Sequence, residues 1–371
     1  MFAADLFESF VMDIDQPPIS DDLLNQLALR FEWHAKNIYG VSSINSSPLY
    51  AQLSLEIAAD PAILSLVAAA DLSQQVSNLL LGAVHFLLLS GVSSPLADYY
   101  PSLSPDPRPR GEAYPYFRAF CLKHANTIRQ LVTTQRVQTN EVQRCTALLP
   151  AFGIVARRAV HRPLALIEIG PSAGLHVLWD RYGYDYGESG YAGNRELPVQ
   201  LLCTPQGSIP VPLPDPLPVV SYRIGIDLAP VDVRDDTAIR WLRALIWPEH
   251  TDRARLLEQA VQIARLDPPS IVAGNAADVL PQVLPTIPPE TALCVYHSYT
   301  LNQCPEPVRE KILDRLLQFA RERDLFRISL EWYSGQNQPH LELFSYEGGL
   351  LQSELLAYCE SHGRTIEWLQ G

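Results

Sequence analysis

The sequence predicts an α/β protein: a Rossmann-like, doubly wound, mostly parallel sheet that follows an N-terminal all-helical domain. Two observations carry this prediction. From residue 21 to residue 160 the apolar residues recur at helical spacing, whereas after Pro163 they form short runs rich in β-branched residues that alternate with helical stretches. Strands that alternate with helices imply right-handed crossovers, and therefore a parallel sheet with helices on both faces.

We expect the chain to divide into three parts: a tail over residues 1–20, a helical domain over 21–162, and a Rossmann-like domain over 163–371. In the third part, apolar runs at 164–169, 222–226, 270–273, 293–296 and 326–330 predict the strands, and 238–266 and 308–323 predict helices between them. Seven prolines between Pro198 and Pro218 exclude a central strand or a helix interior there. Residues 183–220 are therefore expected to form an irregular insertion near the mouth of the sheet.

Composition excludes several classes of protein. The 371 residues are 47% hydrophobic and 19% charged, against about 25% charged in ordinary globular proteins, which indicates a well-filled interior. The net charge of −13 repels a phosphate backbone, so no nucleic-acid partner is expected. The apolar run 79–92 is shorter than the roughly 20 residues that cross a bilayer and contains His85, which predicts a buried helix and no membrane partner.

The termini and the cysteines bear on location. Residues 1–20 carry four acidic residues and no Lys or Arg, unlike the positive start of a secretory signal. The six cysteines are scattered without paired CxxC spacing, which suits reduced thiols and does not suit a metal site. We therefore expect a cytoplasmic protein without a bound metal.

The strongest motif is the segment 164–175, LALIEIGPSAGL, which is typical of a buried strand that runs through a glycine-containing turn into a helix. In an open α/β sheet a ligand binds at this carboxyl end of the first strand. Glycine lets the backbone approach the ligand, and free N–H groups at a helix start favour polar or anionic groups. The sequence therefore predicts the functional site here.

This segment resembles the first motif of class I S-adenosylmethionine-dependent methyltransferases, an acidic residue followed by one apolar residue and then glycines at alternate positions. Glu168, Gly170 and Gly174 occupy the matching positions, and Ser172 stands in place of the middle glycine. In that family the loop wraps the methionine and ribose parts of the cofactor, and the acidic residue helps to hold the loop or the amino-acid moiety. The resemblance implies S-adenosylmethionine as the cofactor and methyl transfer to a small molecule or a protein.

The next two strands extend the resemblance. Asp227 ends the second strand, where a carboxylate can accept hydrogen bonds from both ribose hydroxyls. Asn275 follows the third strand in a stretch that resembles the Gly-Asp-Ala segment beside the adenine ring, and its carbonyl oxygen could accept from the adenine amino group. The cofactor site predicted in this way consists of Glu168, Gly170, Ser172, Gly174, Asp227 and Asn275.

His297 is the candidate catalytic residue. It follows the fourth strand, at the edge of the sheet where ligands bind. Histidine titrates near neutrality and could take the proton that a nucleophile releases. The alternative is that His297 only hydrogen-bonds the loop that contains Asn302.

Two other functions fit the same motif. Residues 170–174 also satisfy G-x-S-x-G, the nucleophile elbow of α/β-hydrolases, which would make Ser172 a nucleophile with Asp278 and either His297 or His340 as its partners. A strand–turn–helix also occurs in nucleotide-binding modules that have no catalytic activity. Whether the protein is an enzyme is therefore open at this point.

Segments along nearly the whole chain also resemble a bacterial family known only by a domain-of-unknown-function label. They are 78–85, 97–103, 137–142, the first-strand motif through Tyr182, and 241–249. In the third of these segments Asn140 can cap a helix, which leaves Glu141 and Arg144 to form a surface pair or to present their charges to a ligand. The resemblance implies homology and no particular reaction.

Overall fold

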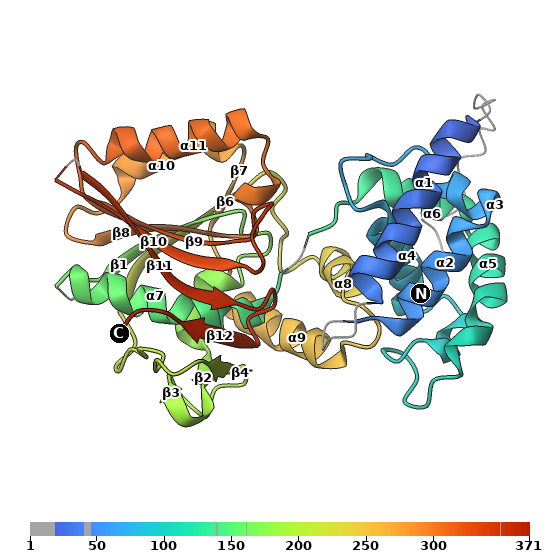
Figure 1. Cartoon of the computed structure of the whole chain (residues 1–371), viewed down its shortest axis with the longest axis horizontal. Helices are drawn as coiled ribbons and strands as arrows, with labels where there is room; N and C mark the ends of the chain where they lie inside the picture. Colours follow the sequence, from blue (N-terminus) through green and yellow to red (C-terminus); the bar gives the residue numbers. More distant parts are fainter. Residues whose placement is uncertain (1–18, 41–45, 139, 161, 349) are drawn as a thin grey trace. The chain divides into compact units, whose positions relative to one another are not determined.

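A computed structural model of the protein describes residues 19–40, 46–138, 140–160, 162–348 and 350–371, so that all but the end of the predicted tail 1–20 lies outside the described residues (Figure 1). The chain forms two compact units: residues up to Val137 together with Trp247–Glu249 form unit 1, and Gln138–Ile246 together with His250–Gly371 form unit 2. The division falls at Val137 and not at the predicted residue 162. The reason is that the helix at 145–158 packs on the sheet.

The described part of unit 1 is built from helices. They are α1 (Asp21–His34), α2 (Pro48–Ala58), α3 (Pro61–Leu64), α4 (Val76–Leu89), α5 (Ala113–Lys123) and α6 (Ala125–Thr134). The side chains of Ser20, Ser47 and Asp60 accept backbone hydrogen bonds at the starts of α1, α2 and α3, where such caps are strongly preferred. Within the described ranges, no helix has the length and apolar character that crossing a membrane requires.

Three residues from far along the sequence complete unit 1. The Glu249 carboxylate accepts hydrogen bonds from Ser47 Oγ (2.6 Å) and from the Leu49 backbone N–H (2.8 Å) at the start of α2. The Trp247 ring packs edge-on against Tyr39 with 5.1 Å between the ring centroids. These contacts explain why Trp247–Glu249 belongs with the helices and not with the sheet.

Unit 2 contains a nine-stranded, mostly parallel sheet with helices, as predicted for an α/β protein. Its strand order is β5-β12-β11-β10-β9-β8-β1-β6-β7. The adjacent strands β7 (Ile271–Ala273), β6 (Val220–Asp227), β1 (Leu164–Ile169), β8 (Ala292–Ser298) and β9 (Leu325–Glu331) run parallel. The strands β10 (His340–Glu347), β11 (Leu350–Cys359) and β12 (Thr365–Trp368) continue the sheet in antiparallel pairs.

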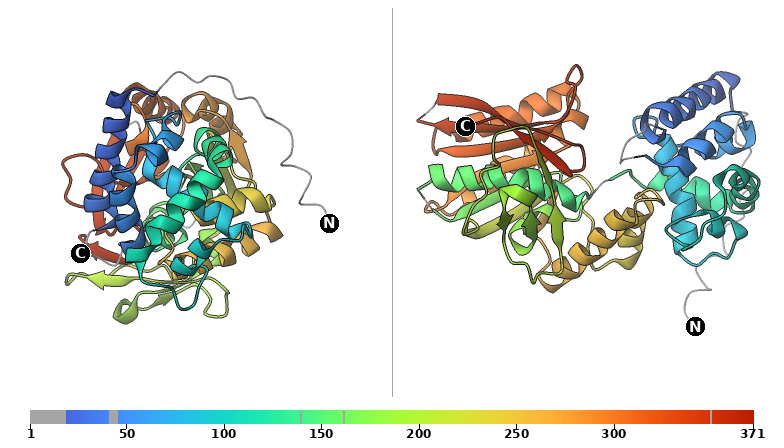
Figure 2. Two further views of the ribbon diagram at one scale, coloured as in Figure 1. Left: turned by 90° about the vertical axis from the view of Figure 1, so that its right-hand side faces the viewer. Right: turned by 60° about the horizontal axis from the view of Figure 1, so that its bottom comes forward.

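Helices cover both faces of this sheet. Helices α10 (Ala276–Val283) and α11 (Glu306–Phe319) lie on one side, and α7 (Cys145–Arg158) lies on the other (Figures 1 and 2). The fully buried strand β1 contributes Ala165 and Ile167 to the core under α10 and α11, and Leu164 and Leu166 to the core under α7. Such burial on both faces is typical of a parallel sheet. Helices α8 (Asp236–Ala244) and α9 (Thr251–Leu266) connect β6 to β7.

The connection from β1 to β6 differs from the expected strand–turn–helix. Instead of an α-helix, a short 3-10 helix, His176–Arg181, follows the glycine-containing turn. The predicted insertion then forms a three-stranded sheet of β2 (Gly183–Asp185), β3 (Tyr191–Ala192) and β4 (Gln200–Leu202). Strand β5 (Thr204–Gln206) lies beside β12 at one edge of the main sheet.

Candidate functional site

The strand order identifies one edge of the sheet as the place for a site. The chain moves outward from β1 to β6 and β7 on one side, and β8 and β9 lie on the other side of β1. The strands that follow β1 in the sequence are thus added first on one side of it and then on the other, so that the strand order reverses between β1 and β8. Ligands of open α/β sheets bind outside the carboxyl ends of the strands at such a reversal.

The loop after β1 has a backbone that requires glycine at two positions. Gly170 has a φ of +76°, and a Cβ there would lie 2.4 Å from Thr300 Oγ1 in the loop after β8. Gly174 has a φ of +73°, and its Cβ would lie 2.7 Å from Pro269 Cβ. Both predicted glycines thus shape the loop, and Gly170 brings it into contact with the loop after β8.

Strain marks both loops at the reversal. Ser172 has a φ of +52° and Tyr299 a φ of +55°. Residues other than glycine rarely adopt this conformation, which costs about 1–3 kcal/mol and tends to occur where a site requires it. The two strained residues lie on the loops after β1 and β8, the two strands that flank the reversal.

Asp227 joins the end of β6 to the loop after β1. Its Oδ2 accepts a hydrogen bond from the Ser172 N–H (2.7 Å) and its Oδ1 accepts one from the Ala229 N–H (2.8 Å). The side-chain oxygen of Asn140 accepts from the next N–H of the loop, that of Ala173 (3.3 Å). The structure therefore brings together Ser172, Asp227 and Asn140, of which the sequence placed the first two in the cofactor site.

Two buried polar atoms in this group have no hydrogen-bond partner among the described residues. They are the hydroxyl oxygen of Ser172, a residue that is 6% exposed, and the amide nitrogen of Asn140. Buried polar groups in proteins are nearly always hydrogen-bonded, because an unmet one costs about 1–3 kcal/mol. The hydrogen-bonding capacity of these two atoms is therefore unused among the described residues.

Glu168 is held inside the protein by its neighbours. Its Oε2 accepts from Tyr296 Oη (3.0 Å) and its Oε1 lies 3.0 Å from His176 Nδ1, while His176 Nε2 donates to the Glu141 carbonyl oxygen (2.8 Å). Both ring nitrogens of His176 thus face oxygen atoms that accept hydrogen bonds. Of the two roles that the resemblance gave to Glu168, holding the loop is the one that these contacts support.

His176 was not among the residues predicted from the sequence. It is 6% exposed and ties the end of β1 to the segment that precedes α7. The only signal in the sequence is its place two residues after Gly174, and no motif distinguishes it from a core histidine.

His297 is fully buried at the carboxyl end of β8. Its Nδ1 donates to Glu331 Oε1 (2.6 Å) and its Nε2 accepts from the Arg327 guanidinium (3.1 Å). This arrangement favours a neutral imidazole, and burial lowers the pKa of His297 in agreement with it. The same carboxylate accepts from the backbone N–H groups of Thr300, Leu301 and Asn302, so the geometry favours the alternative in which His297 supports the loop.

Asn275 serves as the N-cap of α10. Its side-chain oxygen, which the prediction assigned to adenine, accepts from the Ala277 N–H (3.0 Å). The structure thus gives the carbonyl group of Asn275 a structural role. A contact between Asn275 and a ligand would have to use the amide nitrogen.

The segment before α7 carries buried charges over this edge of the sheet. Glu141 is 3% exposed and accepts from Arg253 Nε (2.6 Å), and Arg144 is 7% exposed and donates through Nε to the Ser361 carbonyl oxygen (3.0 Å). Burial opposes the ionisation of Glu141, but the positive charges around it, led by that of Arg253, bring its pKa below the ordinary value. Neither residue forms the surface pair that was one of the two predicted roles.

The hydrolase triad is not assembled among the described residues. The Ser172 hydroxyl has no hydrogen-bonded histidine. Asp278 pairs with Lys311 (2.7 Å), and His340 contacts Gln336 (3.0 Å). His297, the other proposed base, is engaged by Glu331 and Arg327.

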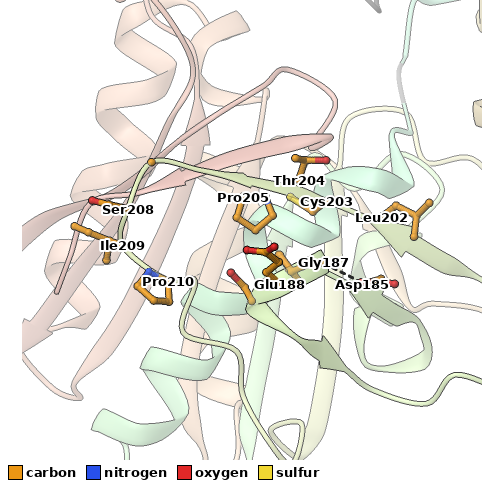
Figure 3. A pocket seen from close by; sticks show the side chains of 13 residues that line it. Asp185, Gly187, Glu188, Leu202, Cys203, Thr204, Pro205, Ser208, Ile209 and Pro210 are labelled. Atoms are coloured by element: carbon orange, nitrogen blue, oxygen red, sulfur yellow. Dashed lines mark hydrogen bonds between the residues drawn. The ribbon is translucent and has the colours of Figure 1, made fainter.

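A groove lies elsewhere, in the insertion, and its lining includes Asp185, Glu188, Leu202, Cys203 and Pro205 (Figure 3). Its volume is about 700 Å³. It contains none of the residues predicted for the cofactor site. In the part of the chain that the structure describes, no group of three His, Cys, Asp or Glu side chains could hold a metal ion.

Comparison with known proteins gives one match. The model of the family described as "Uncharacterized protein conserved in bacteria (DUF2332)" matches residues 39–368. No curated protein and no solved structure matches the chain.

Proposed function

The chain belongs to the DUF2332 family, and we propose that unit 2 binds S-adenosylmethionine at the carboxyl ends of β1, β6 and β7 and acts as a methyltransferase-like protein on a small molecule or a protein. In this proposal the parallel strands β7-β6-β1-β8-β9 form a Rossmann-like core, and the helices of unit 1 form a separate N-terminal domain. The strand order supports the first part, because it reverses beside the glycine-containing loop.

One observation carries the proposal: the Asp227 carboxylate lies against the loop after β1, beside two unpartnered polar atoms. Each Asp227 oxygen accepts one backbone hydrogen bond, and a carboxylate oxygen can accept two. A ribose could therefore donate its hydroxyls to the remaining positions. Ser172 Oγ and Asn140 Nδ2 would meet further polar atoms of the same ligand.

The residues present fit such a cofactor, which when bound would supply an electrophilic methyl group. Gly170 and Gly174 set the shape of the loop that would hold it, and Glu168 would keep the loop in place through His176. Asn275 would lie beside the adenine ring. We propose His297 as a residue that positions the loop after β8 through Glu331, and a direct catalytic contact of His297 is the alternative.

A nucleotide-binding module without catalytic activity is the second candidate. The observation in its favour is that both ring nitrogens of His297, the residue proposed to take a proton, are engaged by Glu331 and Arg327. Cofactor binding is common to both candidates, so binding is the first property to test.

Isothermal titration calorimetry with S-adenosylmethionine and S-adenosylhomocysteine tests whether the protein binds the cofactor. The same measurement with adenosine and 2′-deoxyadenosine tests whether Asp227 contacts the ribose. If Asp227 accepts from the ribose, the wild-type protein binds adenosine more tightly than 2′-deoxyadenosine, and D227N loses this preference together with about tenfold in affinity for the cofactor. The matched control is D232N, five positions further on, where the exposed carboxylate pairs with Arg234.

If the wild-type protein binds neither S-adenosylmethionine nor S-adenosylhomocysteine, the proposed cofactor site is rejected. Unchanged preference between the two nucleosides in D227N would reject the site. A fluorophosphonate probe that labels the wild-type protein and not S172A would instead favour the hydrolase.

A further inference from the structure

Arg144 is a buried cation without an acidic partner. Only 7% of the residue is exposed, and its one hydrogen bond among the described residues joins Nε to the Ser361 carbonyl oxygen. None of the ion pairs among the described residues includes Arg144. The two terminal nitrogens of the guanidinium, which form the planar fork that binds carboxylates, thus have no acceptor there.

Arg253, a neighbouring buried arginine, has the carboxylate partner that Arg144 lacks. Arg253 is equally buried, and its Nε donates to the Glu141 carboxylate at 2.6 Å. An unpaired buried charge is costly, so a buried arginine normally has an acid in contact with it. Burial lowers the pKa of Arg144, although Glu141 acts from a distance in the opposite direction.

Arg144 lies against the loop that follows β8. Its guanidinium carbon is 4.0 Å from the centroid of the Tyr299 ring, and Tyr299 is one of the two strained residues at the reversal of the sheet. The ring holds one face of the guanidinium by a cation–π contact and leaves the edges of the fork unoccupied.

A second unpartnered polar atom lies on the same side of the sheet. Side chains alternate along a strand, so Ser298 shares a face of β8 with Tyr296, whose ring packs against Phe152 of α7. Arg144 immediately precedes α7. Ser298 is 8% exposed, and its hydroxyl has no hydrogen-bond partner among the described residues.

We propose that Arg144, supported by the Tyr299 ring and with the Ser298 hydroxyl as a second donor, binds a carboxylate group of a ligand at the reversal of the sheet. The fork of Arg144 would donate two parallel hydrogen bonds to the carboxylate oxygens. A singly charged carboxylate fits better than a doubly charged phosphate, because Arg144 is a single cation and Glu141 and Glu331 are near it.

The carboxylate could come from two sources. It could belong to the substrate or to the amino-acid part of S-adenosylmethionine, and both assignments depend on the proposed function. The recognition of a carboxylate by Arg144 is common to both, and it can be tested with a small anion alone.

The test is an NMR titration of the ¹⁵N-labelled full-length protein with sodium acetate, compared with neutral acetamide of similar size, at constant ionic strength set with chloride. We expect the Nε–H signal of Arg144, assigned by its loss in R144Q, to shift and saturate with acetate and not with acetamide. The Nε–H signal of Arg253 is the internal control, because the guanidinium of Arg253 is already paired with the Glu141 carboxylate and should not bind acetate, whereas acetate at the terminal nitrogens of Arg144 changes the surroundings of its Nε–H.

Variants sharpen the result. R144Q should lower the affinity for acetate at least about tenfold, and R144K, which keeps the charge and loses the fork, should lower it nearly as much. The control R234Q removes an arginine from an exposed ion pair and should leave the affinity unchanged. If R144Q does not fold, the loss of the Nε–H signal in R144K assigns it, and the wild-type titration still decides the question.

No saturable shift of the Arg144 signal with acetate, or an equal shift with acetamide, would overturn the proposal. If saturating S-adenosylhomocysteine abolishes acetate binding, the carboxylate is that of the cofactor. If both bind together, it is that of the substrate. If neither adenosine nor S-adenosylhomocysteine binds while acetate does, the proposed function fails and the carboxylate site remains.

Discussion

The substitution E331Q tests how the loop after β8 is held. Glu331 is 1% exposed at the end of β9, and its carboxylate accepts four hydrogen bonds. Oε1 accepts from His297 Nδ1 (2.6 Å) and from the N–H groups of Thr300 (3.1 Å) and Leu301 (3.0 Å), and Oε2 accepts from the N–H of Asn302 (3.2 Å).

The expected cost follows from these contacts. A glutamine has one acceptor oxygen, which can serve the three donors at Oε1, so its NH₂ group must face the Asn302 N–H. The Asn302 N–H then loses its acceptor and the glutamine NH₂ faces another donor, which together cost about 1–3 kcal/mol, and the other three hydrogen bonds lose the contribution of the negative charge. We expect about 3 kcal/mol in total, which corresponds to about a hundredfold in the equilibrium for opening this loop.

Hydrogen exchange measured by mass spectrometry on peptides that cover residues 299–303 reads this opening directly. Exchange in E331Q should be about a hundredfold faster there than in the wild-type protein. The control E306Q, at an exposed carboxylate 3.6 Å from Arg309, should change the stability by less than about 0.5 kcal/mol. Equal exchange in the two variants would refute the claim that Glu331 holds the loop.

Three further predictions concern the same unit. G170A should lower the stability of unit 2, measured by urea unfolding, by more than about 2 kcal/mol, because a Cβ at position 170 meets the loop after β8. The control G335A should cost about 1 kcal/mol, because Gly335 has a φ of +88° with open space around it. R253M should lower the stability by about 3–5 kcal/mol, because it leaves the buried carboxylate of Glu141 without its partner. In a double-mutant cycle, adding E141Q should restore part of the lost stability. Burial lowers the pKa of His297 below its usual value of about 6.5. As the pH falls, the imidazole therefore becomes protonated in the unfolded chain at a higher pH than in the folded protein. The stability due to neutral His297 is thus complete above about pH 6.5 and declines below it, and the decline should be shallower in H297N.

The sequence could predict the sheet because local signals determine its parts. Strand β1 is a run of six buried residues that is followed by a glycine, and the sequence marks both its length and its end. The positive φ values of Gly170 and Gly174 require residues of their type, so the loop is visible in the sequence as a motif. Asp227 was recognisable because an acidic residue ended an apolar run.

Other features depend on partners far apart in the chain. Glu141 and Arg253 are separated by 112 positions, and nothing in either local segment shows that they meet. The same is true of Glu249, which caps α2 from 200 positions away. The 3-10 helix after Gly174 replaces the expected α-helix, and the insertion that follows it occupies the place of an ordinary helical crossover.

The contacts at the reversal of the sheet distinguish groups that hold the loops from groups whose hydrogen-bonding capacity is unused. Glu168, His297 and Glu331 are almost fully buried, and each is hydrogen-bonded to neighbouring groups of the protein. Among the described residues, the buried atoms without partners include the hydroxyls of Ser172 and Ser298 and the amide nitrogen of Asn140. The terminal nitrogens of Arg144 also have no acceptor there. We therefore expect D227N to remove the proposed ribose contact without removing the proposed carboxylate contact, and R144Q to do the reverse.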